Sequence, residues 1–299
     1  PYIAGKGGGG AFVLCYLIFL VILGLPVMTM EFAVGRASQK SPVKAYQALE
    51  KPGQKWHIHG YITVIGCYLL MMFYTTVSGW MLHYFYLTAT GKFTGLDADQ
   101  VGGVFNEMLS QPLVMAFWMI VVVAIGIFVC SRGLQNGLEK ITKVMMIALL
   151  AIMVVLAINS IMMDGAAEGL KFYLIPDFER MKELGIGYTI VTAMNQAFFT
   201  LSLGIGAMAI FGSYIGKERS LLGESANIAI LDTFVAIVSG LIIFPACFTF
   251  GVSPTSGPSL IFITLPNIFN HIPMGRLWGS LFFIFMTFAA FSTVLAVFE

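Results

Sequence analysis

Seven apolar segments, each long enough to cross a lipid bilayer as a helix, constrain this chain more than any other feature. Hydrophobic residues make up 58% of the chain and charged residues 10%, whereas a soluble domain is about 25% charged. Because lipid offers no partner to a free backbone N–H or C=O, such long runs favour helices over the short alternating strands of a barrel. We therefore expect an all-α polytopic membrane protein with one transmembrane domain over residues 1–299 and spans at residues 11–34, 60–90, 113–130, 141–163, 188–214, 225–251 and 277–299.

Basic residues gather in alternate loops. The loops at 36–57, 131–140 and 216–224 hold most of the lysines and arginines, whereas the acidic residues concentrate in the other loops. The positive-inside rule predicts that the basic loops are cytoplasmic and that the protein lies in the inner (plasma) membrane. The chain begins at Pro1 without a leader and ends inside an apolar run, so we expect an internal fragment of a longer protein.

The segment 188–214 has a weak point near its middle. Gly204 and Gly206 lie one residue apart, next to the hydroxyls of Thr200 and Ser202. One interpretation is a helix that is unwound near 202–206 and turns its free backbone groups toward a bound solute. The other is a small-residue face that lets a neighbouring helix approach closely.

A second unusual segment lies between the last two spans. Its apolar run at 260–265 is too short to cross a bilayer and is flanked by prolines. We expect residues 254–273 to form an extracellular helical hairpin that dips back into the protein.

Two carboxylates lie in or beside apolar segments. Asp232 lies deep in its span, where an uncompensated charge is costly, so it is an ion ligand, a proton carrier or an acid bonded to a neighbouring helix. Glu31 is either an interfacial acid serving Arg36 or a buried carboxylate behind a binding site.

Hydroxyl groups supply further candidates. Ser292 and Thr293 follow two alanines, and oxygen-only ligands suit a hard cation such as sodium, although such hydroxyls also bond back to their own helical turn. The Tyr74 phenol can donate to a carboxylate or pack as a core aromatic.

The sequence gives no support for a metal-binding protein or an enzyme. The four cysteines lack metal-ligand spacing, His57 and His59 have no adjacent carboxylate or thiolate, and no nucleotide or hydrolase motif occurs. We expect no enzyme and no nucleic-acid partner; the partners are the lipid bilayer and a small molecule.

Four motifs resemble the neurotransmitter:sodium symporters. Residues 31–36 resemble their second helix, 198–206 their unwound sixth helix, 262–266 their fourth extracellular loop and 288–293 their eighth helix, in that order. The resemblance implies the LeuT-type inverted-repeat helical bundle, here from the end of helix 1 into helix 8. It also implies sodium-coupled import of a neutral, apolar or aromatic amino acid by alternating access.

The same resemblance assigns roles to particular residues. It implies a first sodium site with Thr200 and Asp232, and a second with the Ala289 carbonyl, Ser292 and Thr293. The implied substrate-binding residues are Leu70, Tyr74, Phe199, Ser202, Ile205, Thr293 and Val297. The remaining ligands, from the first helix, would precede Pro1.

Chloride is not expected. Tyr16 and Gln196 match two chloride ligands of the chloride-dependent relatives, but the position of the third, a serine, is Ala236. Asp232 stands where those relatives have asparagine, so it supplies the negative charge that chloride would provide. Two alternatives stay open, namely a proton-coupled transporter that uses Asp232 or Glu31 and a non-transporting amino-acid sensor.

Overall fold

The computed structural model describes residues 1–132, 135–255 and 257–298, and these residues form helices with no strand beyond one isolated bridge between Gly9 and Pro176. Residues 133–134 of the predicted loop, residue 256 of the predicted hairpin and residue 299 of the last predicted span lie outside this description. The helices are α1 (Tyr2–Lys6), α2 (Gly10–Phe19), η1 (Leu20–Gly24), α3 (Leu25–Ser38), α4 (Pro42–Leu49), α5 (His57–Ala89), α6 (Ala98–Leu109), α7 (Pro112–Ser131), α8 (Gln135–Ile161), α9 (Ala166–Leu174), α10 (Phe178–Leu184), α11 (Ile186–Thr200), α12 (Ala207–Tyr214), α13 (Leu221–Thr249), α14 (Ser259–Phe262), α15 (Thr264–His271) and α16 (Gly275–Phe298).

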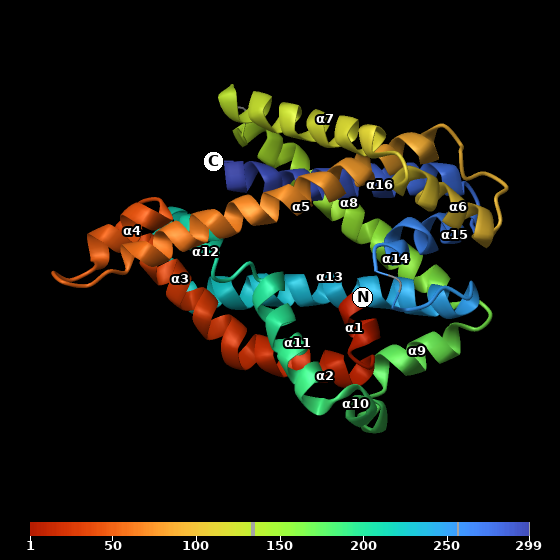
Figure 1. Ribbon diagram of the computed structural model, residues 1–299, viewed down its shortest axis with the longest axis horizontal. Coiled ribbons are helices and arrows are strands. Elements are labelled where there is room, and N and C mark those ends of the chain that lie inside the picture. Colours follow the sequence, from red (N-terminus) through yellow and green to blue (C-terminus); the bar gives the residue numbers. More distant parts are fainter. Residues whose placement is uncertain (133–134, 256, 299) are drawn as a thin grey trace. The chain divides into compact units, whose positions relative to one another are not determined.

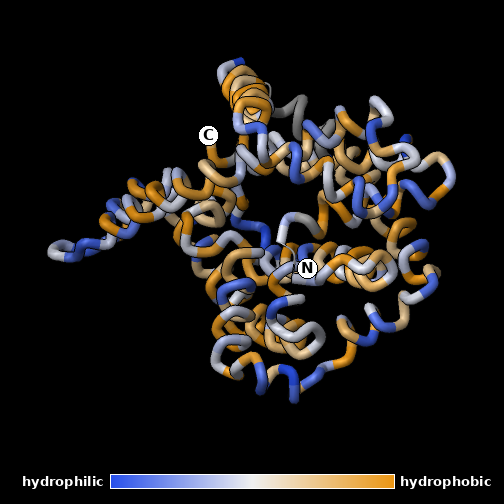
Figure 2. Tube along the Cα trace, turned by 45° about the vertical axis from the view of Figure 1, so that its right-hand side comes forward, coloured by the Kyte–Doolittle hydropathy of each residue, from blue (hydrophilic) through white to orange (hydrophobic). Residues whose placement is uncertain are grey.

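Within the described residues, six helical stretches are long and apolar enough to cross a membrane. Figure 2 shows the apolar residues distributed along these helices, with the hydrophilic residues mainly in the connections. The fifth predicted span, 188–214, is not among these six, because it consists of two shorter helices, α11 and α12, separated by residues 201–206. The predicted hairpin at 254–273 contains the short helices α14 and α15.

The helices divide into two compact units. Unit 1 contains residues 1–2, 71–171 and 238–299, and unit 2 contains residues 3–70 and 172–237. The long helices α5 and α13, labelled in Figure 1, each contribute residues to both units.

The core of unit 1 forms around α16, which packs against α7 and α8. Val122 and Val129 of α7 are buried with Phe291 and Leu295 of α16. A second, aromatic cluster centres on Tyr84 of α5, whose ring centroid lies 4.7 Å from that of Phe262 and 5.3 Å from that of Phe283. Burial of these apolar side chains against one another holds the unit together.

In unit 2, the backbones of α3 and α12 are in direct contact, because a glycine on each helix faces the other. A Cβ added at Gly35 would collide with the carbonyl of Ala209, and one added at Gly212 would lie 2.5 Å from the carbonyl oxygen of Phe32. This close crossing holds α12, the second half of the broken span, against α3.

A π-helical turn, η1, joins α2 to α3, and the sequence did not predict it. A Cβ added at Gly24, the last residue of this turn, would lie 2.8 Å from the Leu201 side chain, at the start of the non-helical stretch. Such π turns recur at functional sites.

Candidate functional site

The site begins at the break between α11 and α12. Ser202, Gly204 and Gly206 have positive φ angles of 52°, 83° and 77°. This left-handed conformation suits glycine, which has no Cβ to clash. A Cβ at Gly204 would meet nothing within 4 Å, so its role is conformational, whereas one at Gly206 would lie 2.9 Å from Pro42 Cγ. Backbone geometry explains Gly204, and close packing adds to it at Gly206.

Glu31 of α3 supports this break directly. Its Oε1 accepts a hydrogen bond from the Gly204 backbone N–H at 2.6 Å, and its Oε2 is buried without a partner among the described residues. Arg36, in contrast, donates to the carbonyl oxygen of Arg219 at 2.9 Å. Of the two roles left open by the sequence, the structure therefore favours the carboxylate behind the break.

Thr200 and Asp232 meet at the end of α11. The Thr200 hydroxyl donates to Asp232 Oδ2 at 2.7 Å, which links the last residue of α11 to α13 within unit 2. Tyr16 of α2 lies close enough to interact with both residues, yet its hydroxyl, like that of Thr233, is buried without a hydrogen bond of normal geometry to a described residue. Four side chains thus bring oxygen atoms to one place.

This oxygen cluster fits a hard cation. Sodium prefers carboxylate and hydroxyl oxygens to thiolates and imidazoles. Buried hydroxyls rarely lack a partner, and an ion or its water shell would provide one for Tyr16 and Thr233. The carboxylate supplies the negative charge that a cation in a membrane helix needs.

The ligands of the second predicted cation site all lie on α16, in unit 1. The Ser292 hydroxyl donates to the Ala289 carbonyl at 2.7 Å, which is the bond back to its own turn that the sequence left open. A hydroxyl that donates in this way keeps its oxygen lone pairs, so the bond does not exclude a cation ligand.

The predicted substrate residues belong to both units. Unit 2 contains Leu70, Phe199, Ser202 and Ile205, and unit 1 contains Tyr74, Thr293 and Val297. The carbonyl of Ile205 accepts a hydrogen bond from the Cys67 thiol at 3.3 Å, which holds the break against α5.

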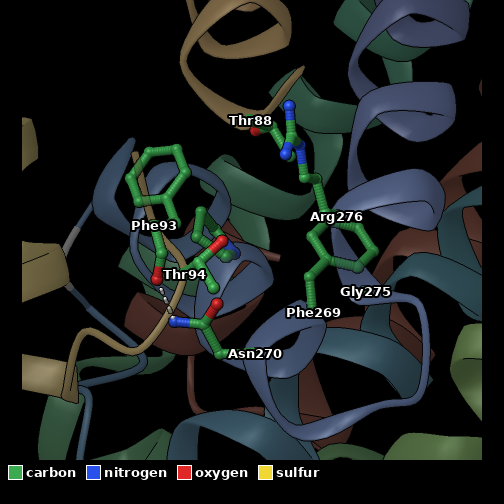
Figure 3. Close-up of a pocket in the computed structure, with 8 residues that line it drawn as sticks. Thr88, Phe93, Thr94, Phe269, Asn270, Gly275 and Arg276 are labelled. Atoms are coloured by element: carbon green, nitrogen blue, oxygen red, sulfur yellow. Dashed lines mark hydrogen bonds between the residues drawn. The ribbon is translucent and has the colours of Figure 1, made fainter. Parts of the chain in front are cut away.

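A small pocket within unit 1 contains none of these residues (Figure 3). It encloses about 20 Å³, room for a single water molecule. Arg276 at the start of α16 donates from Nε to the carbonyl of Ala89 at 2.9 Å, and Asn270 of α15 donates to the carbonyl of Phe93 at 2.8 Å. The pocket therefore lies where hydrogen bonds connect α15 and α16 to the end of α5 and the loop that follows it.

The two histidines at the start of α5 each contact a residue of the preceding segment. His57 bonds through Nδ1 to Glu50 at 2.8 Å, and the His59 ring packs edge-on against Tyr46. No group of three or more histidine, cysteine, aspartate or glutamate side chains suited to a metal occurs in the part of the chain that the structure describes. The sequence did not predict the Glu50–His57 contact, because the two residues are separated by a loop.

Comparison with known proteins identifies relatives over the full chain. The model of the sodium:neurotransmitter symporter family matches residues 1–108 and 98–299. The chain is 36% identical over 299 residues to an uncharacterized sodium-dependent transporter, YhdH, of Bacillus subtilis, covering all of this chain and 65% of that protein. It is 29% identical over 308 residues to an uncharacterized sodium-dependent transporter of Haemophilus influenzae, of which it covers 66%. The chain thus spans slightly less than two thirds of the length of these two relatives.

A solved structure shows the same fold. The crystal structure of MhsT in complex with L-phenylalanine superposes with a TM-score of 0.93 at 37% sequence identity, over all of this chain and 67% of that one. The fold is therefore the LeuT-type bundle, and the family and its members are transporters rather than enzymes. On these matches, the chain belongs to the sodium:neurotransmitter symporter family.

Proposed function

We propose that the protein is a sodium-coupled importer of a neutral, apolar or aromatic amino acid that works by alternating access. The observation that carries this proposal is the contact between Thr200 and Asp232 at the end of a broken membrane helix. Broken helices with oxygen ligands at the break form the ion and substrate sites of many secondary transporters. Membership of a sodium symporter family supports the same function.

The substrate side chain would lie among hydrocarbon groups. Leu70, Phe199, Ile205 and Val297 are apolar, and Tyr74 supplies a phenol that donates to the substrate carboxylate. Among the seven proposed substrate residues none is acidic or basic, so a charged side chain would be buried without a partner at considerable cost. The relative MhsT is seen in complex with L-phenylalanine, which fits this class.

Two sodium ions would be transported with the amino acid. Thr200 and Asp232 would bind the first, and the Ala289 carbonyl, Ser292 and Thr293 the second. Bound ions would stabilise the outward-open state and complete the substrate site, and loss of the second ion to the cytoplasm would permit inward opening. Chloride would not be required, because the Asp232 carboxylate already balances the first ion.

The topology belongs to the same proposal. The protein would cross the inner (plasma) membrane with the loops at 36–57, 131–140 and 216–224 in the cytoplasm. The segment of α14 and α15 would then be an extracellular hairpin.

Uptake of radiolabelled amino acids into vesicles, with and without an inward sodium gradient, tests the proposal. We expect uptake that needs sodium and that leucine, methionine and aromatic amino acids inhibit. Uptake driven by a proton gradient alone would favour a proton-coupled transporter, and binding without uptake would favour a sensor. Inhibition by lysine or glutamate alone would contradict the proposed substrate class.

A further inference from the structure

The stretch from Lys40 to Lys55, which runs through α4 to the start of α5, carries a strong local positive charge. Lys40, Lys44, Lys51 and Lys55 are all exposed, and among the described residues none has an ion pair or a side-chain hydrogen bond. They lie in a single stretch of unit 2 that ends where the membrane helix α5 begins. The loop between α4 and α5 is the hydrophilic tip at the left of Figure 2.

The one acidic residue of this stretch is already engaged. Glu50 accepts hydrogen bonds from the His57 backbone N–H at 3.1 Å and from its ring at 2.8 Å. Its carboxylate is therefore turned toward the start of α5, and no other acid between residues 36 and 61 balances the lysines. The stretch presents a net positive surface.

The loop has a defined shape, and apolar side chains lie beside its charges. The Lys51 backbone N–H donates to Gln54 Oε1 at 3.1 Å, and the Gln54 N–H donates to the Lys51 carbonyl at 3.0 Å. Trp56 is 59% exposed and Ile58 is 48% exposed. Tryptophan at the end of a membrane helix is typical of the headgroup region, with lysines reaching the phosphates.

We propose that the lysines at 40, 44, 51 and 55, together with Trp56, form a binding surface for the headgroups of anionic phospholipids. Clusters of cations immediately beside a membrane helix attract acidic lipids. The exposed apolar side chains would enter the interface while the lysines bind phosphate oxygens.

Quenching of Trp56 fluorescence in reconstituted bilayers tests the proposal. The chain contains four tryptophans, so the difference between the wild type and Trp56→Phe isolates the emission of Trp56. At equal mole fraction, brominated phosphatidylglycerol should quench this emission more than brominated phosphatidylcholine. Raising potassium chloride from about 0.1 M to about 1 M should remove the excess, because the screening length falls from about 10 Å to about 3 Å.

Substitutions locate the effect. Lys51→Gln should reduce the excess quenching, and the triple substitution of Lys44, Lys51 and Lys55 by glutamine should abolish it. Lys92→Gln, which removes one exposed lysine after the other end of α5, is the matched control and should leave it unchanged. Equal quenching by both lipids in the wild type, as expected if the partner were a soluble anion, would overturn the proposal. An equal loss in Lys92→Gln would overturn it as well, because the attraction would then not be local.

Discussion

The Glu31 carboxylate accepts a hydrogen bond from the backbone N–H of Gly204, 173 residues later in the chain. The donor lies in the non-helical stretch between α11 and α12, where the helical hydrogen-bond ladder is interrupted. A side chain from α3 thus replaces a bond that the broken helix has lost, and it holds the break in one conformation.

Removing this carboxylate should weaken both the fold and the function. Glu31→Ala leaves the exposed Gly204 N–H without its protein acceptor, and a hydrogen bond of this kind contributes about 0.5–1.5 kcal/mol to stability. We expect a lower melting temperature in detergent and a loss of most sodium-dependent uptake, whereas Glu31→Gln, which keeps an acceptor oxygen, should be milder. Glu183→Ala, on the exposed surface of α10, is the control. Equal behaviour of Glu31→Ala and the control would contradict the role.

Asp232→Asn tests the first sodium site and the chloride argument together. Loss of the carboxylate should raise the sodium concentration for half-maximal uptake by about tenfold, equal to about 1.4 kcal/mol. Combining it with Ala236→Ser restores the residue pattern of the chloride-dependent relatives and should make uptake depend on chloride. Replacing chloride by gluconate at constant sodium measures this. A sharp fall in wild-type uptake under that exchange would refute the argument from Asp232.

The proposed second sodium site predicts a separate effect. Ser292→Ala and Thr293→Ala each remove a hydroxyl ligand from α16 and should raise the sodium requirement without preventing folding, because Ser292 bonds only to Ala289 of its own turn among the described residues. Sodium titration of substrate binding by the double variant is the measurement. Its sodium dependence should differ clearly from that of the wild type, and an unchanged curve would exclude the site.

The glycine crossing of α3 and α12 makes a prediction about stability. Gly35→Ala places a Cβ against the Ala209 carbonyl and should destabilise the protein by about 1–3 kcal/mol, as overpacking does. Gly187→Ala is the matched control, because a Cβ there meets nothing within 4 Å and alanine favours the helix. Thermal unfolding in detergent compares the two variants, and we expect opposite shifts. A Gly35→Ala protein as stable as the wild type would show that the helices separate easily.

Glu50 and His57 predict a pH dependence outside the membrane-spanning segments. Desolvation alone would raise the pKa of the Glu50 carboxyl, but hydrogen bonds from the His57 backbone and ring outweigh it and lower the pKa. A carboxyl with a lowered pKa stabilises the folded state above its ordinary value of about 4.3, and this contribution is lost as the pH falls through the lowered pKa. The stability difference between the wild type and Glu50→Gln should therefore shrink below about pH 4. A difference that stays constant between pH 7 and the acid range would contradict this.

Some of these features follow from sequence patterns and some do not. Apolar run length predicts where α5 and α16 lie, because a span must satisfy its own backbone. Paired glycines suggest the break near Gly204. The contact of Glu31 with that break depends on how α3 crosses α12, and side chains distant in sequence leave no periodic signal of such a crossing. The bond between Ser292 and Ala289 was one of two open choices, because the same hydroxyl serves a cation or its own turn.

The π-helical turn at Leu20–Gly24 sets how the helical segments before and after it are rotated relative to each other. A π turn accommodates one more residue than an α turn, so η1 absorbs the extra residue within Leu20–Gly24. Removing a residue from the regular α-helix between this turn and Glu31 would instead rotate Glu31 by about 100° around the helix axis. Tyr16 lies before this turn and Glu31 after it, and the two face the Asp232 region and the Gly204 break, respectively. A deletion of one residue between Gly24 and Glu31, which would be harmless in a surface loop, would therefore turn Glu31 away from Gly204, so the number of residues in this part of the helix decides whether the two meet.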